Sequence, residues 1–238
     1  MEQITVGDLK IDIVRKKIKN MHLGVYPPAG RVRIAAPLEV NDDAIRLFAV
    51  SKIGWIKRNR LKFKDQERIP LREYKNRESH YFRGSRYLLN IIESDTLPKV
   101  VLKNKTRIDL YIRPGTPVKK RHEIFTEWYR TELKKQVPQI IKKWEKRLKV
   151  KVNDWRVRQM KTRWGSCNIE KKRIWINLEL AKKPEHCLEY IIVHEMVHFM
   201  ERHHNDRFLY YMEKYLPNWK QLKKELNKLP ASHADWKY

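Results

Sequence analysis

The 238-residue chain is poor in cysteine and glycine, and each shortage excludes a class of protein. Its two cysteines, Cys167 and Cys187, do not form a CxxC pair. Two cysteines cannot build the disulfide framework of a small secreted domain, and this count is typical of a reducing compartment. The chain has only 7 glycines, which argues against a glycine-rich nucleotide-binding fold.

Long apolar runs are also missing. No stretch approaches the ~20 consecutive apolar residues that a membrane helix needs. Residues 1–17 contain no apolar run of the length found in signal peptides. We therefore expect a cytoplasmic protein without a membrane-spanning segment.

Acidic residues are scarce relative to basic ones. The chain has 28 Asp and Glu against 54 Lys and Arg, a formal net charge of +26. Basic pairs and triplets occur from end to end, which indicates a broad positive field more than one docking patch. Such a field attracts polyanions, so we expect nucleic acid or nucleotides as partners. The alternative is a basic surface that only keeps the protein soluble.

The N-terminal half is predicted to be rich in β-structure. Residues 11–14 and 31–34 are short β-like runs, and the turn sequence at residues 26–30 between them predicts a hairpin. Asn41 is a predicted N-cap for a helical segment. A second β-rich stretch covers residues 81–112. No internal repeat is visible in the sequence.

A proline-rich break at residues 114–117 separates this half from the rest. We place a domain boundary there, with a β-rich domain at residues 1–115 and a second domain at residues 116–238. Residues 120–148 predict an amphipathic helix, or a helix pair interrupted at Pro138.

The second domain continues with more β-structure and a helix. Residues 150–157 and 173–180 are predicted strands. Pro184 then suits the first turn of a further helix, which is strongly apolar.

That apolar helix contains an HExxH motif, His194-Glu195-Met196-Val197-His198. Residues four apart share one face of a helix, so both imidazoles can reach one metal ion. Glu195 is one position further round and can hydrogen-bond a water molecule at the metal. The motif also arises by chance on helices whose histidines only contact water. We favour a zinc site, because histidines on so apolar a helix need partners.

A catalytic zinc ion needs a third protein ligand, and several candidates follow His198. They are Glu201, His203, His204 and Asp206. We favour His204, because it leaves room for the chain to turn back and directly precedes Asn205, a predicted N-cap of a new helix. His203 would point elsewhere.

The order of these motifs resembles the YgjP-like metallopeptidases, relatives of the SprT-like and WLM proteases among the zincins. The resemblance rests on residues 161–167 (KTRWGSC), the strand at 174–180, Pro184 and residues 194–208 (HEMVHFMERHHNDRF). It implies an α+β fold: a zincin-like minimal metallopeptidase domain of helices and a small mixed sheet, after a β-rich N-terminal domain. It also implies His194, His198 and His204 as the ligands of a zinc ion. Glu201 stands where metzincins have glycine, so the chain is not a metzincin.

The RWGSC stretch has two interpretations. Arg163, or the backbone at Gly165 and Ser166, can hold substrate or an oxyanion beside the site. Alternatively, Trp164 fills the core and Gly165-Ser166 forms a turn, which is the interpretation that we favour. Candidate substrate-binding residues are Arg163, Trp164, Gly165, Ser166, Trp175 and Asn177. The strand at residues 174–180 is expected to pair with an extended peptide.

Three functions fit these residues. We favour a zinc-dependent peptidase that acts on peptide or protein substrates, with Glu195 as general base. The same metal site acting on a nucleoside triphosphate is a second candidate, since the basic surface suits that substrate as well. The third is a basic nucleic-acid-binding module with a structural zinc ion. Glu195 beside the ligands argues against it, since structural zinc sites usually have four protein ligands.

Overall fold

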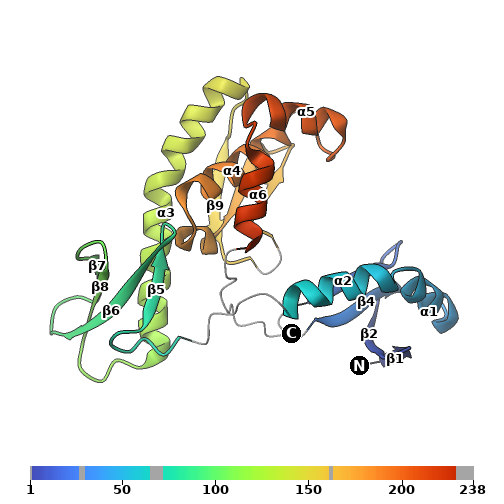
Figure 1. Cartoon of the computed structure of the whole chain (residues 1–238), viewed down its shortest axis with the longest axis horizontal. Coiled ribbons are helices and arrows are strands. Elements are labelled where there is room, and N and C mark those ends of the chain that lie inside the picture. The colour runs from blue at the N-terminus through green and yellow to red at the C-terminus, as the bar shows by residue number, and fades with distance from the viewer. Residues whose placement is uncertain (1, 27–29, 65–71, 161–162, 229–238) are drawn as a thin grey trace. The chain divides into compact units, whose positions relative to one another are not determined.

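The structure, a computed structural model, describes residues 2–26, 30–64, 72–160 and 163–228. These residues form a mixed α+β fold and divide into two compact units, residues 2–64 and residues 72–228 (Figure 1). In this described part, every helix is too short or too polar to cross a membrane.

The first unit is built on a four-stranded sheet with the order β1-β2-β4-β3. Its strands are β1 (Glu2–Val6), β2 (Leu9–Lys16), β3 (His22–Tyr26) and β4 (Arg31–Pro37). The predicted hairpin between residues 11–14 and 31–34 is wrong, because β2 and β4 pair in parallel. The antiparallel partner of β4 is β3, a strand that the sequence analysis missed. Residues 27–29 of the predicted turn lie outside the described residues.

Helices α1 (Asp42–Ser51) and α2 (Ile53–Lys64) follow the sheet. The predicted N-cap is confirmed, because the Asn41 side chain accepts a hydrogen bond of 2.9 Å from the Ala44 N–H. The sheet and both helices share one apolar core. Its buried members are Ile4, Leu9, Ile11, Ile13, Val32, Ile34, Ala36, Ile45, Ala49 and Ile56.

The second unit begins with a sheet of the same topology. Strands β5 (Ser79–Phe82), β6 (Ser85–Glu93), β7 (Lys99–Leu102) and β8 (Arg107–Ile112) lie in the order β5-β6-β8-β7, again with a parallel central pair. The registers also correspond: Leu23 pairs with Ile34 in the first sheet, and Val100 with Leu110 in the second. A structural repeat is therefore present although the sequence shows none. Side-chain volume and pattern suffice to specify a sheet, so its topology can recur without sequence identity.

Helix α3 (Val118–Leu148) is one continuous helix of 31 residues, so Pro138 does not divide it. Its buried face repeats at helical spacing through Phe125, Tyr129, Leu133, Val137, Ile141, Trp144 and Leu148. Pro138 removes one N–H from the helix. Burial of this apolar face on both sides of the proline holds the helix together.

A second, smaller sheet lies next to α3, with the order β10-β11-β9. Strand β9 covers Asp154–Arg158, β10 covers Gly165–Asn168 and β11 covers Arg173–Asn177. The predicted strand at residues 173–180 is too long. The Asn177 side chain accepts a hydrogen bond from the Glu179 N–H, which starts the 3-10 helix η1 (Leu178–Lys182). Gly165 and Ser166 belong to β10 and do not form the predicted turn.

Three helices complete the second unit: α4 (Glu185–Val197), α5 (Asp206–Tyr215) and α6 (Trp219–Lys228). Pro184 directly precedes the first residue of α4, as its position predicted. The Asn205 side chain accepts a hydrogen bond of 3.0 Å from the Phe208 N–H, so the predicted N-cap of α5 is also confirmed.

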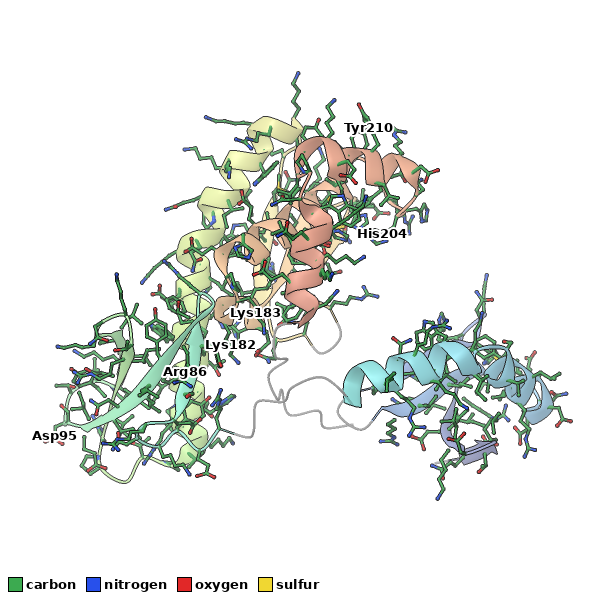
Figure 2. All side chains as sticks on the ribbon, in the orientation of Figure 1. Arg86, Asp95, Lys182, Lys183, His204 and Tyr210 are labelled. Atoms are coloured by element: carbon green, nitrogen blue, oxygen red, sulfur yellow. The ribbon has the colours of Figure 1, made fainter. Side chains whose placement is uncertain are left out.

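Residues 114–117 do not separate compact units, because the β5–β8 sheet belongs with the helices that follow it. The tip of the β5–β6 hairpin docks on η1, where the Arg83 and Gly84 N–H groups donate to the Ala181 and Lys182 carbonyls at 2.9 and 3.2 Å (Lys182 is labelled in Figure 2). A Cβ on Gly84 would lie 2.6 Å from the ring of Pro184. The core is therefore continuous across the predicted boundary at residue 115, and the division into two compact units falls between the described residues 64 and 72.

Candidate metal centre

Helix α4 carries the two histidines of the HExxH motif near its C-terminal end. His194 lies in the last turn and His198 is the C-cap. Their ring centroids are 5.0 Å apart, so both imidazoles face one point. The His198 Nδ1 atom lies 3.1 Å from the Glu201 carbonyl oxygen. This contact fixes Nδ1 as the protonated nitrogen and leaves Nε2 with a free lone pair.

His204 reaches the same point from the residue before the α5 N-cap. Its Nε2 atom lies 3.1 Å from Nε2 of His194. One ligand atom from each of His194, His198 and His204 lies within 4.8 Å of the others. His203 is exposed and outside this group; its N–H donates to the Glu201 carboxylate. The side chain of Phe208 packs against all three rings, with centroids 4.7 to 5.0 Å away.

The charge state of these histidines suits a metal ion. Burial, with the charges of His198, His204 and Lys223, lowers the pKa of His194 to about 3. Burial also lowers the pKa values of His198 and His204. Neutral imidazoles are the form that binds metal. Two nitrogens of a tetrahedral zinc site lie about 3.3 Å apart, given Zn–N bonds of ~2.05 Å. The 3.1 Å between the Nε2 atoms of His194 and His204 is close to that separation, and the His198 ligand atom lies within 4.8 Å of both.

Glu195 lies deep beside the histidines, with 6% of its surface exposed. Burial raises the pKa of its carboxyl to about 7, against the lowering effect of a hydrogen bond from the Cys167 thiol and of the Arg163 charge. Burial and the nearby carboxylate raise the pKa of Cys167 to about 12, so Cys167 stays a thiol and donates. A carboxyl with a pKa near 7 is suited to accept and return a proton at neutral pH.

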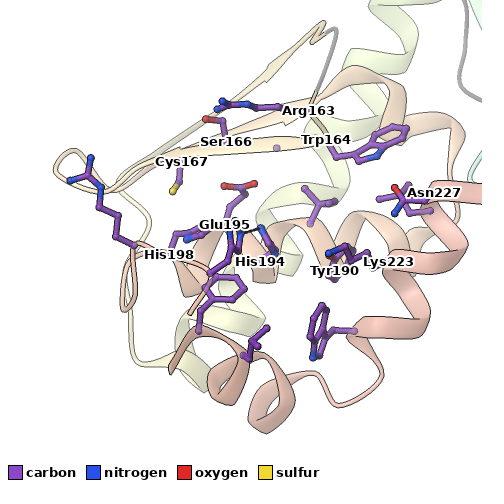
Figure 3. A pocket seen from close by; sticks show the side chains of 18 of the residues that line it. Arg163, Trp164, Ser166, Cys167, Tyr190, His194, Glu195, His198, Lys223 and Asn227 are labelled. Atoms are coloured by element: carbon purple, nitrogen blue, oxygen red, sulfur yellow. Dashed lines mark hydrogen bonds between the residues drawn. The ribbon is translucent and has the colours of Figure 1, made fainter. Parts of the chain in front are cut away.

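Glu195 has room only because a glycine faces it. A Cβ placed on Gly165 would lie 2.6 Å from the Glu195 Oε1 atom and 2.8 Å from a methyl carbon of Ile191. Gly165 is the first residue of β10, which pairs with β11 alone and is an edge strand of the described sheet. Its free edge runs beside the metal centre (Figure 3).

A cavity of about 830 Å³ opens over the three histidines and Glu195. Four of the predicted substrate-binding residues line it, namely Arg163, Trp164, Gly165 and Ser166. A role of this stretch in substrate binding stays a prediction, and the position of these residues in the cavity is compatible with it. Trp164 is only half-buried, with the Lys183 ammonium 5.7 Å from its ring.

Trp175 and Asn177 lie elsewhere. Both belong to β11, the central strand of its sheet, and neither lines the cavity. The Asn177 amide donates to the carbonyls of Met160 and Arg163 at 2.9 and 2.7 Å, so it holds the segment before β10. Because β11 already pairs on both sides, it cannot take an extended peptide as we had expected, and β10 has the free edge.

Sequence reasoning missed several residues of this cavity. Tyr190 lines it and contacts His194 edge-on, with ring centroids 6.0 Å apart. Its position four residues before His194 places it on the same helix face, which is the signal that could have found it. Arg202, Trp219 and Lys223 also line the cavity, and no motif marks them. Outside the cavity, His186 lies 2.8 Å from the Glu225 carboxylate.

Three histidines whose ligand atoms lie within 4.8 Å of one another, with a buried glutamate after the first, could hold a metal ion in the manner of an HExxH metallopeptidase. Residues 19–229 match the family described as YgjP-like, metallopeptidase domain. The chain belongs to this family.

Two solved structures are similar over a part of the chain. The crystal structure of the metallopeptidase zymogen of Pyrococcus abyssi abylysin shares 19% identity, with a TM-score of 0.36, and the match covers 38% of this chain and 90% of that one. The crystal structure of the metallopeptidase zymogen of Methanocaldococcus jannaschii jannalysin shares 21% identity, with a TM-score of 0.34, and covers 38% and 92%. Comparison with curated proteins gives no match.

Proposed function

We propose that the chain is a zinc-dependent peptidase in which Glu195 is the general base. The observation that carries this proposal is the convergence of His194, His198 and His204 beside a buried carboxyl, in a cavity that an edge strand borders. When bound, a zinc ion supplies a Lewis acid that polarises a carbonyl group and lowers the pKa of water.

The chain's own residues supply the other steps. The free edge of β10 offers backbone groups to an extended peptide and aligns it across the cavity. Glu195 accepts a proton from the attacking water molecule and passes it to the leaving amine. The Cys167 thiol donates a hydrogen bond to Glu195 and thereby orients its carboxylate. Because Gly165 has no side chain, the Glu195 carboxylate has room beside β10.

Replacing Glu195 by Gln tests this role. Gln keeps the shape of the side chain and cannot accept the proton, so zinc content should stay while peptide cleavage falls by at least ~100-fold. Glu185→Gln, at an exposed position in the first turn of the same helix, is the matched control and should keep its activity. Near-parent turnover in Glu195→Gln would show that another group is the base. Loss of zinc would make Glu195 a structural residue.

A nucleotide phosphohydrolase is the second candidate. Three cations, Arg163, Arg202 and Lys223, line the cavity and suit a triphosphate. We favour the peptidase, because an edge strand along the site has no use in binding a nucleotide. Incubating the zinc-loaded protein with casein and with a panel of nucleoside triphosphates separates the two: release of phosphate or pyrophosphate without peptide cleavage would overturn the peptidase.

A structural zinc site in a nucleic-acid-binding module is the weakest of the three. The described residues bring three ligand atoms together, not four, and place Glu195 beside them. We still propose that the net charge of +26 draws the enzyme to nucleic acid without sequence preference. Affinity for duplex DNA should then fall with salt at a log–log slope of about −0.9 per phosphate neutralised. Titration of labelled DNA at two salt concentrations measures it.

A further inference from the structure

The cavity over the metal centre has an excess of positively charged side chains. Among the described residues that line it, Arg163, Arg202 and Lys223 are cationic and Glu195 is the one carboxyl group. In the proposed function, Glu195 transfers a proton and contacts the attacking water molecule. No other acidic side chain among the described lining residues neutralises the three cations.

Two of these cations, Arg202 and Lys223, have no carboxylate partner within the part of the chain that the structure describes. Neither Arg202 nor Lys223 forms an ion pair there, although Lys143, Lys182 and Lys220 of the same unit each pair with a glutamate. The nearest acidic neighbours in sequence are engaged elsewhere. Glu201 accepts a hydrogen bond from the His203 N–H, and Glu225 contacts His186.

Arg202 and Lys223 lie on two different sides of the metal centre. Arg202 follows the ligand His198 and also lines an adjoining cavity of about 480 Å³, which continues past Asn168 to Glu170 at the β10–β11 turn. Lys223 lies on α6, and Figure 3 shows it near Tyr190 and Asn227, on the side of His194 that faces away from His198. A chain that follows β10 across the cavity would pass one cation before the metal centre and one after it.

We propose that the site selects acidic peptide segments, with Arg202 and Lys223 each binding a carboxylate on opposite sides of the bond that is cut. Arginine offers a carboxylate a two-pronged set of donors and lysine a point charge. Arg163 is assigned no selectivity, because it precedes β10 and Figure 3 shows its side chain beside Ser166, at the strand that would hold the peptide. This inference rests on the proposed peptidase function and names its substrate class.

Four quenched fluorescent peptides with one neutral core sequence test the proposal on the full zinc-loaded chain. They carry Asp on both sides of the cut bond, Asp on one side or the other, or Asn on both. Both cations are exposed, so we expect each Asp to raise kcat/KM about threefold and the pair about tenfold. Raising the salt concentration from 50 to 500 mM should remove most of this preference.

Substitutions of Arg202 and Lys223 test whether these two residues cause the preference for Asp. Arg202→Gln should abolish the preference for Asp on one side only, and Lys223→Gln on the other side only. Arg202→Glu should reverse the preference toward a peptide with Lys at that position, which a merely unstable variant would not do. Lys224→Gln and Arg207→Gln are the matched controls, because both residues are exposed and neither lines the cavity.

The activity of the parent protein distinguishes a failure of the proposed peptidase function from a failure of the proposed acidic selectivity. If the parent protein cleaves none of the peptides and no casein, the proposed function itself fails. If it cleaves the Asn and Asp peptides equally, the peptidase stands and the acidic selectivity is overturned. A preference for Asp that survives in both Arg202→Gln and Lys223→Gln overturns the assignment to these two residues.

Discussion

Gly165 and Glu195 face each other so closely that no larger residue fits at position 165. The added Cβ of an alanine would lie 2.6 Å from the carboxylate oxygen and 2.9 Å from the Glu195 Cγ atom. The φ angle of Gly165 is not in the left-handed region, so the backbone conformation alone would allow a larger residue at this position. Space, and not conformation, requires the glycine.

Gly165→Ala should therefore displace the Glu195 carboxyl and lower peptide turnover by about tenfold or more, since a 1 Å misplacement can cost as much as ~100-fold. Zinc content should not change, because the three histidines do not contact Gly165. Gly54→Ala is the control: its nearest added contact is 3.6 Å, to a side-chain nitrogen of Arg58. Turnover of Gly165→Ala equal to that of Gly54→Ala would show that the close contact has no catalytic consequence.

The choice of His204 over His203 predicts a difference between two neighbouring alanine variants. His204→Ala should lose most of the zinc, because it removes one of three imidazoles that converge on one point. His203→Ala should retain the metal, since His203 uses only its backbone N–H near the site. Metal analysis of the purified proteins decides the question. Equal retention in the two variants contradicts the ligand assignment.

Glu195 should make the metal-free protein less stable as the pH rises. Its folded pKa of about 7 lies above the ordinary value of 4.5, so folding favours the protonated form and stability is lost as the pH rises from about 4.5 to about 7. Glu195→Gln removes that penalty and should gain up to ~3 kcal/mol of unfolding free energy at pH 8. Urea unfolding of chelator-treated protein at pH 5 and pH 8 measures the difference. A variant that is no more stable than the parent at pH 8 contradicts it.

Glu189 should show the opposite sign. Despite burial, hydrogen bonds from Lys143 Nζ at 2.5 Å and Trp144 Nε1 at 2.7 Å, with the charge of Lys143, hold the pKa of Glu189 below its usual range. Its contribution is present above the unfolded pKa and is lost as the pH falls through the folded one. Glu189→Gln should thus lose about 1 kcal/mol at pH 7 and little at pH 3. The same urea series tests it, and a loss that persists at pH 3 would assign the effect to packing.

Local sequence patterns predicted which residues converge at the candidate metal centre better than they predicted which strands pair. His194, Glu195 and His198 follow from helical spacing, and His204 from the N-cap at Asn205, because both signals act within one or two turns. Strand pairing is different. In the parallel pairing of β2 with β4, partners such as Ile11 and Val32 are 21 positions apart, and the turn sequence at residues 26–30 favours a hairpin when only local signals are considered. Arg202 and Lys223 reach the cavity only through tertiary packing, which no short motif records.

The domain boundary was misplaced for a related reason. Residues 114–117 have the composition of a linker, yet they only connect β8 to α3. The apolar stripe of α3 that packs against β5–β8 looks the same in sequence as the stripe that packs against the metal-binding part. Composition reports where the chain turns, while the extent of a core depends on what packs across that turn.

The 31 residues of α3 form a rod about 46 Å long at 1.5 Å per residue. Near one end of the helix, Phe125 and Trp128 contact His80 and Phe82 of β5, with ring centroids 4.6 and 4.7 Å apart. Near the other end, the Trp144 Nε1–H group donates a hydrogen bond to Glu189 of α4. Local opening at either end must therefore break contacts along a single shared element. The amide hydrogens of β6 and of α4 should therefore exchange with nearly the same free energy of opening. Binding of a metal ion should raise this free energy in both elements. Hydrogen exchange in the β5–β8 sheet would then show whether the metal centre is occupied.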